Sequence, residues 1–332
     1  MIDGRDLRSL GVLKLVAAAA ILLSLPSLFG PVLAGEIIVF AIFAIGFNFL
    51  LGYAGELSFG HAALIGSGAY GTILFANYVF EGVFVSMFVA ILAVTVIGVV
   101  YGYVSIQRRG IYFAMITLAL AQIFYFLAFE LRDYTGGDDG IALPFGIESP
   151  LPVDPTAGGM EFYAVAMFVL VVIWFGVKRI VNSPFGLVLL AIRENEKRAS
   201  HLGYNANSYI LGAFIISAFI SGIAGALYAV LFNFIHPSIL HWSVSGDVVL
   251  MTLIGGVGTL AGPIVGALAY LVIQDTVVSY FDHWEIVFGI IIIVTVLFAP
   301  EGIWGLYQKY VEGESQARNV KDIVRELLPG GD

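Results

Sequence analysis

Long runs of apolar residues, separated by short charged or Gly/Pro-rich segments, make up most of the chain. A helix that crosses the roughly 30 Å hydrocarbon core of a bilayer needs about 20 mostly apolar residues. Because the eighth apolar run is short, we expect eight to ten transmembrane helices. The runs predict helical spans at residues 11–29, 32–51, 59–78, 83–105, 111–130, 161–178, 209–234, 246–257, 260–281 and 285–304.

Composition agrees with this pattern and predicts an all-α, polytopic membrane protein. Of the 332 residues, 60% are hydrophobic and only 12% are charged, which is more apolar surface than a soluble fold of this length buries. The chain has no cysteine, so disulfides, iron–sulfur clusters and thiol catalysis are excluded. No small-residue cleavage pattern follows the first apolar run, and we interpret that run as a retained helix.

The distribution of basic residues predicts the orientation. Lys and Arg in short loops are retained on the cytoplasmic side. With a cytoplasmic N-terminus, Arg132 alone of the 15 basic residues lies outside, and both termini are cytoplasmic. We therefore expect one transmembrane domain at residues 1–310, with a cytoplasmic loop at 179–208, an acidic outer loop at 131–160 and a charged tail at 311–332. The net charge of −9 comes mostly from loops and tails and does not suggest nucleic-acid binding.

Two Gly-rich segments indicate an internal duplication. Residues 52–70 lie early in the chain, residues 255–270 lie late, and both end in an Ala-Tyr pair. If ten spans divide into two sets of five, the second half crosses in the opposite sense, as in the inverted repeats of many transporters.

The cytoplasmic segment 178–209 is longer than a connector requires. Asn182, Ser183 and Pro184 predict a helix start, and Gly203 predicts its end. Between them, apolar residues at helical spacing and a dense mixture of charges predict one amphipathic helix; the apolar positions are Leu187, Leu190 and Ala191. Such a helix either binds a partner protein or lies flat on lipid headgroups.

The run Glu196-x-x-Ala199-Ser200-x-x-Gly203 is similar to the EAA-type loop of ABC importer permeases. With the preceding Gly186-x6-Arg193-Glu194 context, it resembles the M-type permeases of branched-chain amino acid importers. Further matches follow the family's order between about residues 40 and 305. They are 52–62 (GYAGELSFGHA), 109–119 (RGIYFAMITLA), 255–263 (GGVGTLAGP) and 300–302 (PEG). The chain departs from the family at Glu56, where Gln is frequent, and at Ser200, where Ala is usual.

The resemblance implies a multi-pass cell-membrane (plasma or inner membrane) subunit that forms a solute pathway with a paralogous permease. Two cytosolic P-loop ATPases would drive it and an extracytoplasmic solute-binding protein would supply it, without a cofactor or metal in this chain. No G-x-x-x-x-G-K-[ST] motif occurs, so we expect the chain itself not to be an enzyme. The residues expected to couple to the ATPase are Arg193, Glu194, Glu196, Ala199, Ser200 and Gly203.

Polar residues and glycines inside the spans are candidates for the pathway, because buried polar groups in a membrane are costly. Each has an alternative role: bonding across helices for Asn48 and Thr117, hydration at the interface for Glu56 and His61, and snorkelling for Asp247 and Asp275. Glycines also allow close helix packing. The candidates are Asn48, Glu56, Ser58, His61, Thr117, Gln122, Gly255, Gly256 and Gly258.

Three classes of function remain open from the residues. A secondary transporter would need coupling-ion ligands near the midplane, and the long cytoplasmic segment would then have no explanation. A membrane-embedded enzyme would need a catalytic motif, and neither H-E-x-x-H nor G-x-S-x-G occurs. Within the importer class, permeases for urea or short-chain amides are similar to those for branched-chain amino acids, which we favour.

Overall fold

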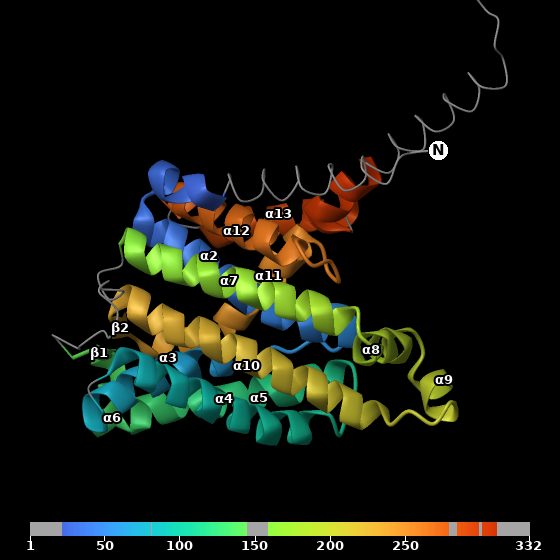
Figure 1. Ribbon diagram of the computed structural model, residues 1–332, viewed down its shortest axis with the longest axis horizontal. Helices are drawn as coiled ribbons and strands as arrows, with labels where there is room; N and C mark the ends of the chain where they lie inside the picture. The colour runs from blue at the N-terminus through green and yellow to red at the C-terminus, as the bar shows by residue number, and fades with distance from the viewer. Residues whose placement is uncertain (1–21, 81, 145–158, 279–283, 299–300, 311–332) are drawn as a thin grey trace, which may run out of the picture.

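The computed structural model describes residues 22–80, 82–144, 159–278, 284–298 and 301–310, and in these ranges the chain is a bundle of helices (Figure 1). Five helices are long and apolar enough to cross a membrane by length and composition: Pro31–Ala54, Val83–Ser105, Ile111–Glu130, Met160–Val181 and Ala206–Phe232. The predicted all-α, polytopic fold is confirmed. Most of the first predicted span and the 311–332 tail lie outside the described residues.

The helices follow the predicted spans closely. The second span is the helix α2 (Pro31–Asn48), which continues as the π-helix η1 (Phe49–Ala54). The eighth span begins earlier than expected, at Trp242, directly after the short helix η4 (Pro237–Leu240). The other long helices are α3 (His61–Tyr78), α4 (Val83–Ser105), α5 (Ile111–Glu130), α7 (Met160–Val181), α10 (Ala206–Phe232), α11 (Trp242–Gly255), α12 (Gly262–Val278) and α13 (Trp284–Phe298).

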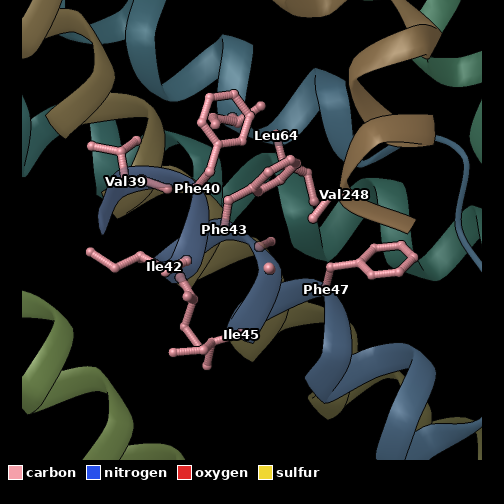
Figure 2. Close-up of a cluster of buried hydrophobic side chains, with 14 of the residues drawn as sticks. Val39, Phe40, Ile42, Phe43, Ile45, Phe47, Leu64 and Val248 are labelled. Carbon is pink, nitrogen blue, oxygen red and sulfur yellow. The ribbon is translucent and has the colours of Figure 1, made fainter. Parts of the chain in front are cut away.

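Two helices, α2 and α10, form the centre of the bundle. Figure 2 shows apolar side chains of α2, including Phe43 and Phe47, among those of neighbouring helices. Helix α10 packs against α3 and α4, whereas α2 packs against α11 and α12, and the two central helices contact each other. By contrast, 28% of the apolar window is buried in α4 and in α5, and 22% in α7, so these helices expose apolar surface suited to lipid.

The two ends of the bundle carry different structures (Figure 1). At one end lie α8 (Pro184–Glu194) and α9 (Glu196–His201). At the other lie α6 (Arg132–Thr135), η2 (Gly137–Asp139) and a two-residue strand pair. In that pair β1 (Ile141–Ala142) is antiparallel to β2 (Phe234–Ile235), which joins the segment after α5 to the end of α10.

Candidate functional site

The segment predicted as one amphipathic helix consists of two helices, so that prediction was wrong. Helix α8 ends at Glu194, and Asn195 has an extended backbone, with φ −160° and ψ 94°. Its side-chain oxygen accepts a hydrogen bond from the Arg198 amide and thereby caps α9. Asparagine favours this capping position over a helix interior, because its side chain competes with the helical backbone for hydrogen bonds. Gly203 does follow the second helix, with φ +91°.

The inward face of α8 is formed mainly by residues other than the apolar positions Leu187, Leu190 and Ala191 named from the sequence. Gly186, Leu189 and Ile192 are buried, whereas Leu187 is 62% exposed and Ala191 is exposed. In α9 the buried residue is Ala199. The apolar residues Leu187 and Ala191, singled out from the sequence, therefore lie on the outer surface of this end, where the predicted amphipathic helix was expected to meet a partner protein or lipid.

One connection between α8 and the bundle, which we name the α8 joint, contains Asn48, Gly52, Arg193, Gly258 and Thr259. The Arg193 guanidinium donates a hydrogen bond to the Gly52 carbonyl in η1. Asn48 donates to the Thr259 carbonyl and accepts from the Gly258 amide, both at 2.8 Å. The joint thus brings together the end of α2, the turn between α11 and α12, and the last turn of α8.

Gly52 allows these segments to approach closely. A Cβ atom at this position would lie 2.5 Å from Asn48 Oδ1 and 2.6 Å from the Gly258 nitrogen. In the adjoining turn, Gly256 has φ +120°, a conformation that favours glycine. The predicted pathway residues Gly255, at the end of α11, and Gly256 and Gly258, in the turn that follows, are therefore packed against other backbone.

A second connection, which we name the α9 joint, contains Glu56, Arg109, Glu196 and Asn207. Arg109 Nε lies 3.5 Å from Glu56 Oε1, and Arg109 Nη2 lies 3.3 Å from Glu196 Oε1. The same guanidinium donates to Asn207 Oδ1 at 2.5 Å. The contact of Arg109 with Glu196 has no local sequence signal, because the two residues are 87 positions apart in the chain.

Glu56 is the most deeply buried charge of the α9 joint, with a side chain 7% exposed. Burial raises the pKa of its carboxyl to about 7, and the negative charge of Glu196 adds to this. Arg109 and a backbone hydrogen bond from Gly110 oppose the rise in pKa. The carboxyl is therefore poised to change its charge near neutral pH.

The segment 55–60, which we name the α2–α3 break, is held by hydrogen bonds from several helices. The Phe59 amide donates to Thr117 Oγ1 at 3.2 Å, and the Tyr101 hydroxyl lies between two carbonyl acceptors, Thr117 at 2.5 Å and Gly60 at 3.1 Å. Ser58 Oγ accepts from the Gly60 amide. The break is consequently a fixed turn that connects α2 to α3.

His61, the first residue of α3, is fully buried, so hydration at an interface does not explain it. Its Nε2 lies 2.8 Å from Ser217 Oγ, and the Ser217 hydroxyl donates to the Gly46 carbonyl at 2.6 Å. Because that hydroxyl has used its hydrogen, His61 Nε2 carries the proton of this pair. The chain of hydrogen bonds joins α3, α10 and α2.

The remaining candidates lie elsewhere. Gln122 is partly buried on α5. Asp247 does not need to snorkel, because its Oδ1 accepts a hydrogen bond from the Tyr270 hydroxyl at 2.6 Å. The structure therefore brings Asn48, Gly258 and Arg193 together in one joint and Glu56 and Glu196 in the other, while Gln122 is not part of either.

Comparison with known proteins agrees with these features. The profile of the family described as branched-chain amino acid transport system / permease component matches residues 13–296. The high-affinity branched-chain amino acid transport system permease protein LivM of Escherichia coli is 26% identical over 286 residues, which cover 80% of this chain and 67% of LivM. The probable LivM permease of Methanocaldococcus jannaschii is 23% identical over 313 residues, which cover 80% of this chain and 90% of that protein.

A second kind of permease is also similar. The LivH permease protein of the high-affinity system of Escherichia coli is 24% identical over 286 residues, which cover 80% of this chain and 91% of LivH. No solved structure matches the chain. With a family profile that spans most of its length and a helical, multi-pass fold, the chain belongs to the permease-component family of branched-chain amino acid transport systems.

Proposed function

We propose that this chain conducts branched-chain amino acids across the cell membrane as one of two related permeases in an ABC importer. Two cytosolic ATPases would drive the importer, and an extracytoplasmic binding protein would deliver the solute. The similarity to both LivM and LivH, each named as a permease protein of a branched-chain amino acid system, supports a pair of related subunits. The observation that carries the proposal is the surface of α8 and α9.

The outer surface of α8 and α9 suits a protein partner better than lipid. Leu187 and Leu202 are 62% and 74% exposed, and they lie among the exposed charges of Glu194, Lys197 and Arg198. A helix that lies on headgroups separates a polar face from an apolar face that enters the membrane. Here the inward side is already filled by the bundle, through Leu189, Ile192 and Ala199 among others. We assign the outer side to the ATPase. Of the proposed coupling residues, Glu194, Ser200 and Gly203 are exposed, whereas Arg193, Glu196 and Ala199 connect α8 and α9 to the bundle.

The solute route is proposed to lie between this chain and the second permease. Two cavities of about 120 and 270 Å³ lie along α5, and apolar side chains dominate both. None of the predicted pathway residues lines either cavity. We propose that a polar route for an amino acid zwitterion includes surface from the second permease, and that Asn48, Glu56, Ser58, His61, Thr117 and Gln122 act on it through the packing of α2, α3 and α5.

Two inverted halves with cytoplasmic termini remain part of the proposal. In an inverted pair of five-helix units, α2 corresponds to α10, α3 to α11 and α4 to α12. The packing fits this correspondence. Helix α10 of the second half packs on α3 and α4 of the first half, while α2 of the first half packs on α11 and α12 of the second half. The orientation can be tested with cysteines introduced in place of Arg108, expected inside, and Tyr134, expected outside. Each variant is labelled from either side of the membrane.

The direct test is transport by the purified assembly. Tagged chain is isolated with its bound subunits, reconstituted in proteoliposomes with ATP inside, and assayed with radiolabelled leucine, isoleucine and valine. We expect ATP-dependent uptake of these amino acids and little uptake of urea or acetamide. Uptake of urea alone would assign the chain to the amide branch, and uptake that stops with a protonophore while ATP remains would indicate a secondary transporter.

Two substitutions test the coupling assignment. Glu196→Lys places a cation beside Arg109, and Gly203→Pro is incompatible with the observed φ of +91°. Both variants should insert in the membrane yet lose transport and solute-stimulated ATPase activity. Normal uptake by either variant, or an assembly in which residues 186–203 contact only lipid, would refute the assignment.

A further inference from the structure

Arg109 connects three segments that are far apart in the sequence. Its Nε and Nη2 atoms face Glu56 of the α2–α3 break and Glu196 of α9, and Nη2 also bonds Asn207 at the start of α10. Its Nη1 donates to the carbonyl of Ile106 at 2.9 Å, which fixes the guanidinium to its own loop. Arginine suits this position because its planar fork presents several donors in a rigid geometry.

Helix α9 has few other attachments to the bundle. It packs mainly on α8 and α10, its neighbours in the chain, and Ala199 is its buried residue. The Arg109–Glu196 pair reaches instead from α9 to the loop between α4 and α5. A displacement of α9 that preserves this pair must therefore move that loop as well.

On its other side, Arg109 faces the α2–α3 break, through which a displacement can reach α3. Glu56 belongs to the α2–α3 break, and the amides that follow it are fixed by Thr117 of α5 and Ser245 of α11. The Ala62 amide, in the first turn of α3, donates to Ser245 Oγ at 2.8 Å. A shift at Glu56 is thus carried into the first turn of α3.

We propose that Arg109 is a positioning residue that transmits the movement of α9 to the α2–α3 break and to the start of α5. The inference rests on the proposed function, because it takes α9 to be moved by an ATPase. Arg109 touches neither nucleotide nor solute in this role. It keeps Glu196 and Glu56 at a fixed separation, so that the coupling segment and the interior turn move together.

The adjacent arginine supplies a matched control. Arg108 is exposed, lies in the same loop, and forms no ion pair within the described part of the chain. Arg108→Gln and Arg109→Gln therefore change the net charge and the charge of this loop equally. Arg109→Lys keeps the positive charge but loses the fork that reaches several partners at once.

The first measurement uses the chain alone, in detergent, and does not depend on transport. Hydrogen exchange at the backbone amides of residues 197–202 should become faster in Arg109→Gln, remain unchanged in Arg108→Gln, and be intermediate in Arg109→Lys. Unchanged exchange in Arg109→Gln would refute the proposal, since α9 would then be held by other contacts.

The second measurement uses the complete assembly in proteoliposomes. Arg109→Gln should lower ATP-driven leucine uptake by about fivefold or more, at the lower end of typical allosteric coupling, while basal ATPase activity persists. Because Arg109 and Glu196 act as one pair, the variant carrying both Arg109→Gln and Glu196→Gln should lose no more uptake than the more affected single variant. The proposed role of Arg109 would be overturned if the uptake losses of the Arg109→Gln and Glu196→Gln variants were fully additive, or if Arg108→Gln and Arg109→Gln lost equal uptake.

The two measurements separate the inference from the proposed function. If exchange increases in Arg109→Gln but uptake of leucine by the unaltered assembly does not require ATP, the contact is real and the importer assignment fails, and with it the inference. If the unaltered assembly shows ATP-driven uptake and Arg109→Gln retains it in full, the importer assignment stands and the role of Arg109 is refuted.

Discussion

The α8 joint and the α9 joint connect the same segment to the bundle with different chemistry. In the α8 joint, Arg193 bonds a main-chain carbonyl 141 positions away in the chain. Asn48 bonds main-chain groups 210 and 211 positions away. In the α9 joint, charged side chains face one another, and Arg109 and Glu196 are 25% and 42% exposed. The first joint thus depends on hydrogen bonds to main-chain groups, and the second depends on ion pairs between side chains.

This difference suggests a division of roles within the coupling segment. Buried hydrogen bonds to main-chain groups are costly to leave unmade, so the α8 joint favours one arrangement of α8, η1 and the turn after α11. Ion pairs near water contribute little to the free energy of unfolding. The Arg109–Glu196 pair can therefore link α9 to the loop before α5 without holding α9 rigidly on the bundle. The extended Asn195 separates α8 from α9, so we expect any movement of one helix relative to the other to occur at this residue.

The largest effect is expected from Asn48→Ala, which removes both hydrogen bonds of the side chain. It leaves the Gly258 amide and the Thr259 carbonyl unpaired in a partly buried site, each at a cost of about 1–3 kcal/mol in the free energy of unfolding. Thermal unfolding in detergent should show a clear fall in midpoint. Asn77→Ala is the control, because that asparagine is exposed at the opposite end and should cost little. An equal fall in unfolding midpoint in the two variants would show that the hydrogen bonds of the α8 joint stabilise the protein no more than those of an exposed asparagine.

Gly52→Ala tests the same joint by adding atoms. The new Cβ would lie 2.6 Å from the Gly258 nitrogen, which belongs to a backbone that cannot move without moving the turn. Overpacking of this kind costs about 1–3 kcal/mol of stability. Gly176→Ala in α7 is the control, since a Cβ there meets nothing within 4 Å and stability should be equal or higher. A stable Gly52→Ala protein would mean that the turn after α11 is free to shift.

The sequence singled out individual residues of the α8 joint but did not predict the contacts between them. Apolar runs and glycine breaks located the helices, because length and hydropathy act locally. Asn48, Arg193 and Gly258 were each singled out, but nothing local indicates that they meet, since Asn48 and Thr259 are 211 positions apart. The break at Asn195 did have a local signal, an asparagine followed by charged residues at the start of a helix, which is typical of a capping position.

The inward face of α8 could not be read from hydropathy alone. Leu187 and Ala191 are apolar yet exposed, whereas Gly186 is buried and packs so closely that a Cβ there would lie 2.2 Å from the Val181 carbonyl oxygen. Helical spacing identifies sets of residues that share a face, but α8 contains two such sets, one with Leu189 and Ile192 and one with Leu187 and Ala191. The packing of α8 against η1, α7 and α10 decides between them.

A smaller effect is expected from the charge of Glu56. Its pKa is raised from 4.5 to about 7 in the folded protein, so the folded state binds more protons than the unfolded state between these values. Stability from this group is therefore complete below about pH 4.5 and is lost as the pH rises through 7. Arg109, Glu196 and the Gly110 amide face this carboxyl. The unfolding midpoint of the unaltered protein should fall relative to that of Glu56→Gln between pH 5 and pH 8. Parallel pH curves for the two proteins would contradict the burial of an ionisable Glu56.

The smallest effect is expected from salt on the Arg109–Glu196 pair. A pair this exposed contributes about 0.2–1 kcal/mol, and ions screen it over a Debye length of about 8 Å at physiological ionic strength. Raising the salt concentration should therefore speed hydrogen exchange in α9 in the unaltered protein and leave exchange in Glu196→Gln unchanged. Exchange near Asn48 and Gly258, whose bonds join uncharged groups, should not respond in either protein. A response of equal size at both places would mean that the two joints open together, and that α8 and α9 move as one body despite the extended residue between them.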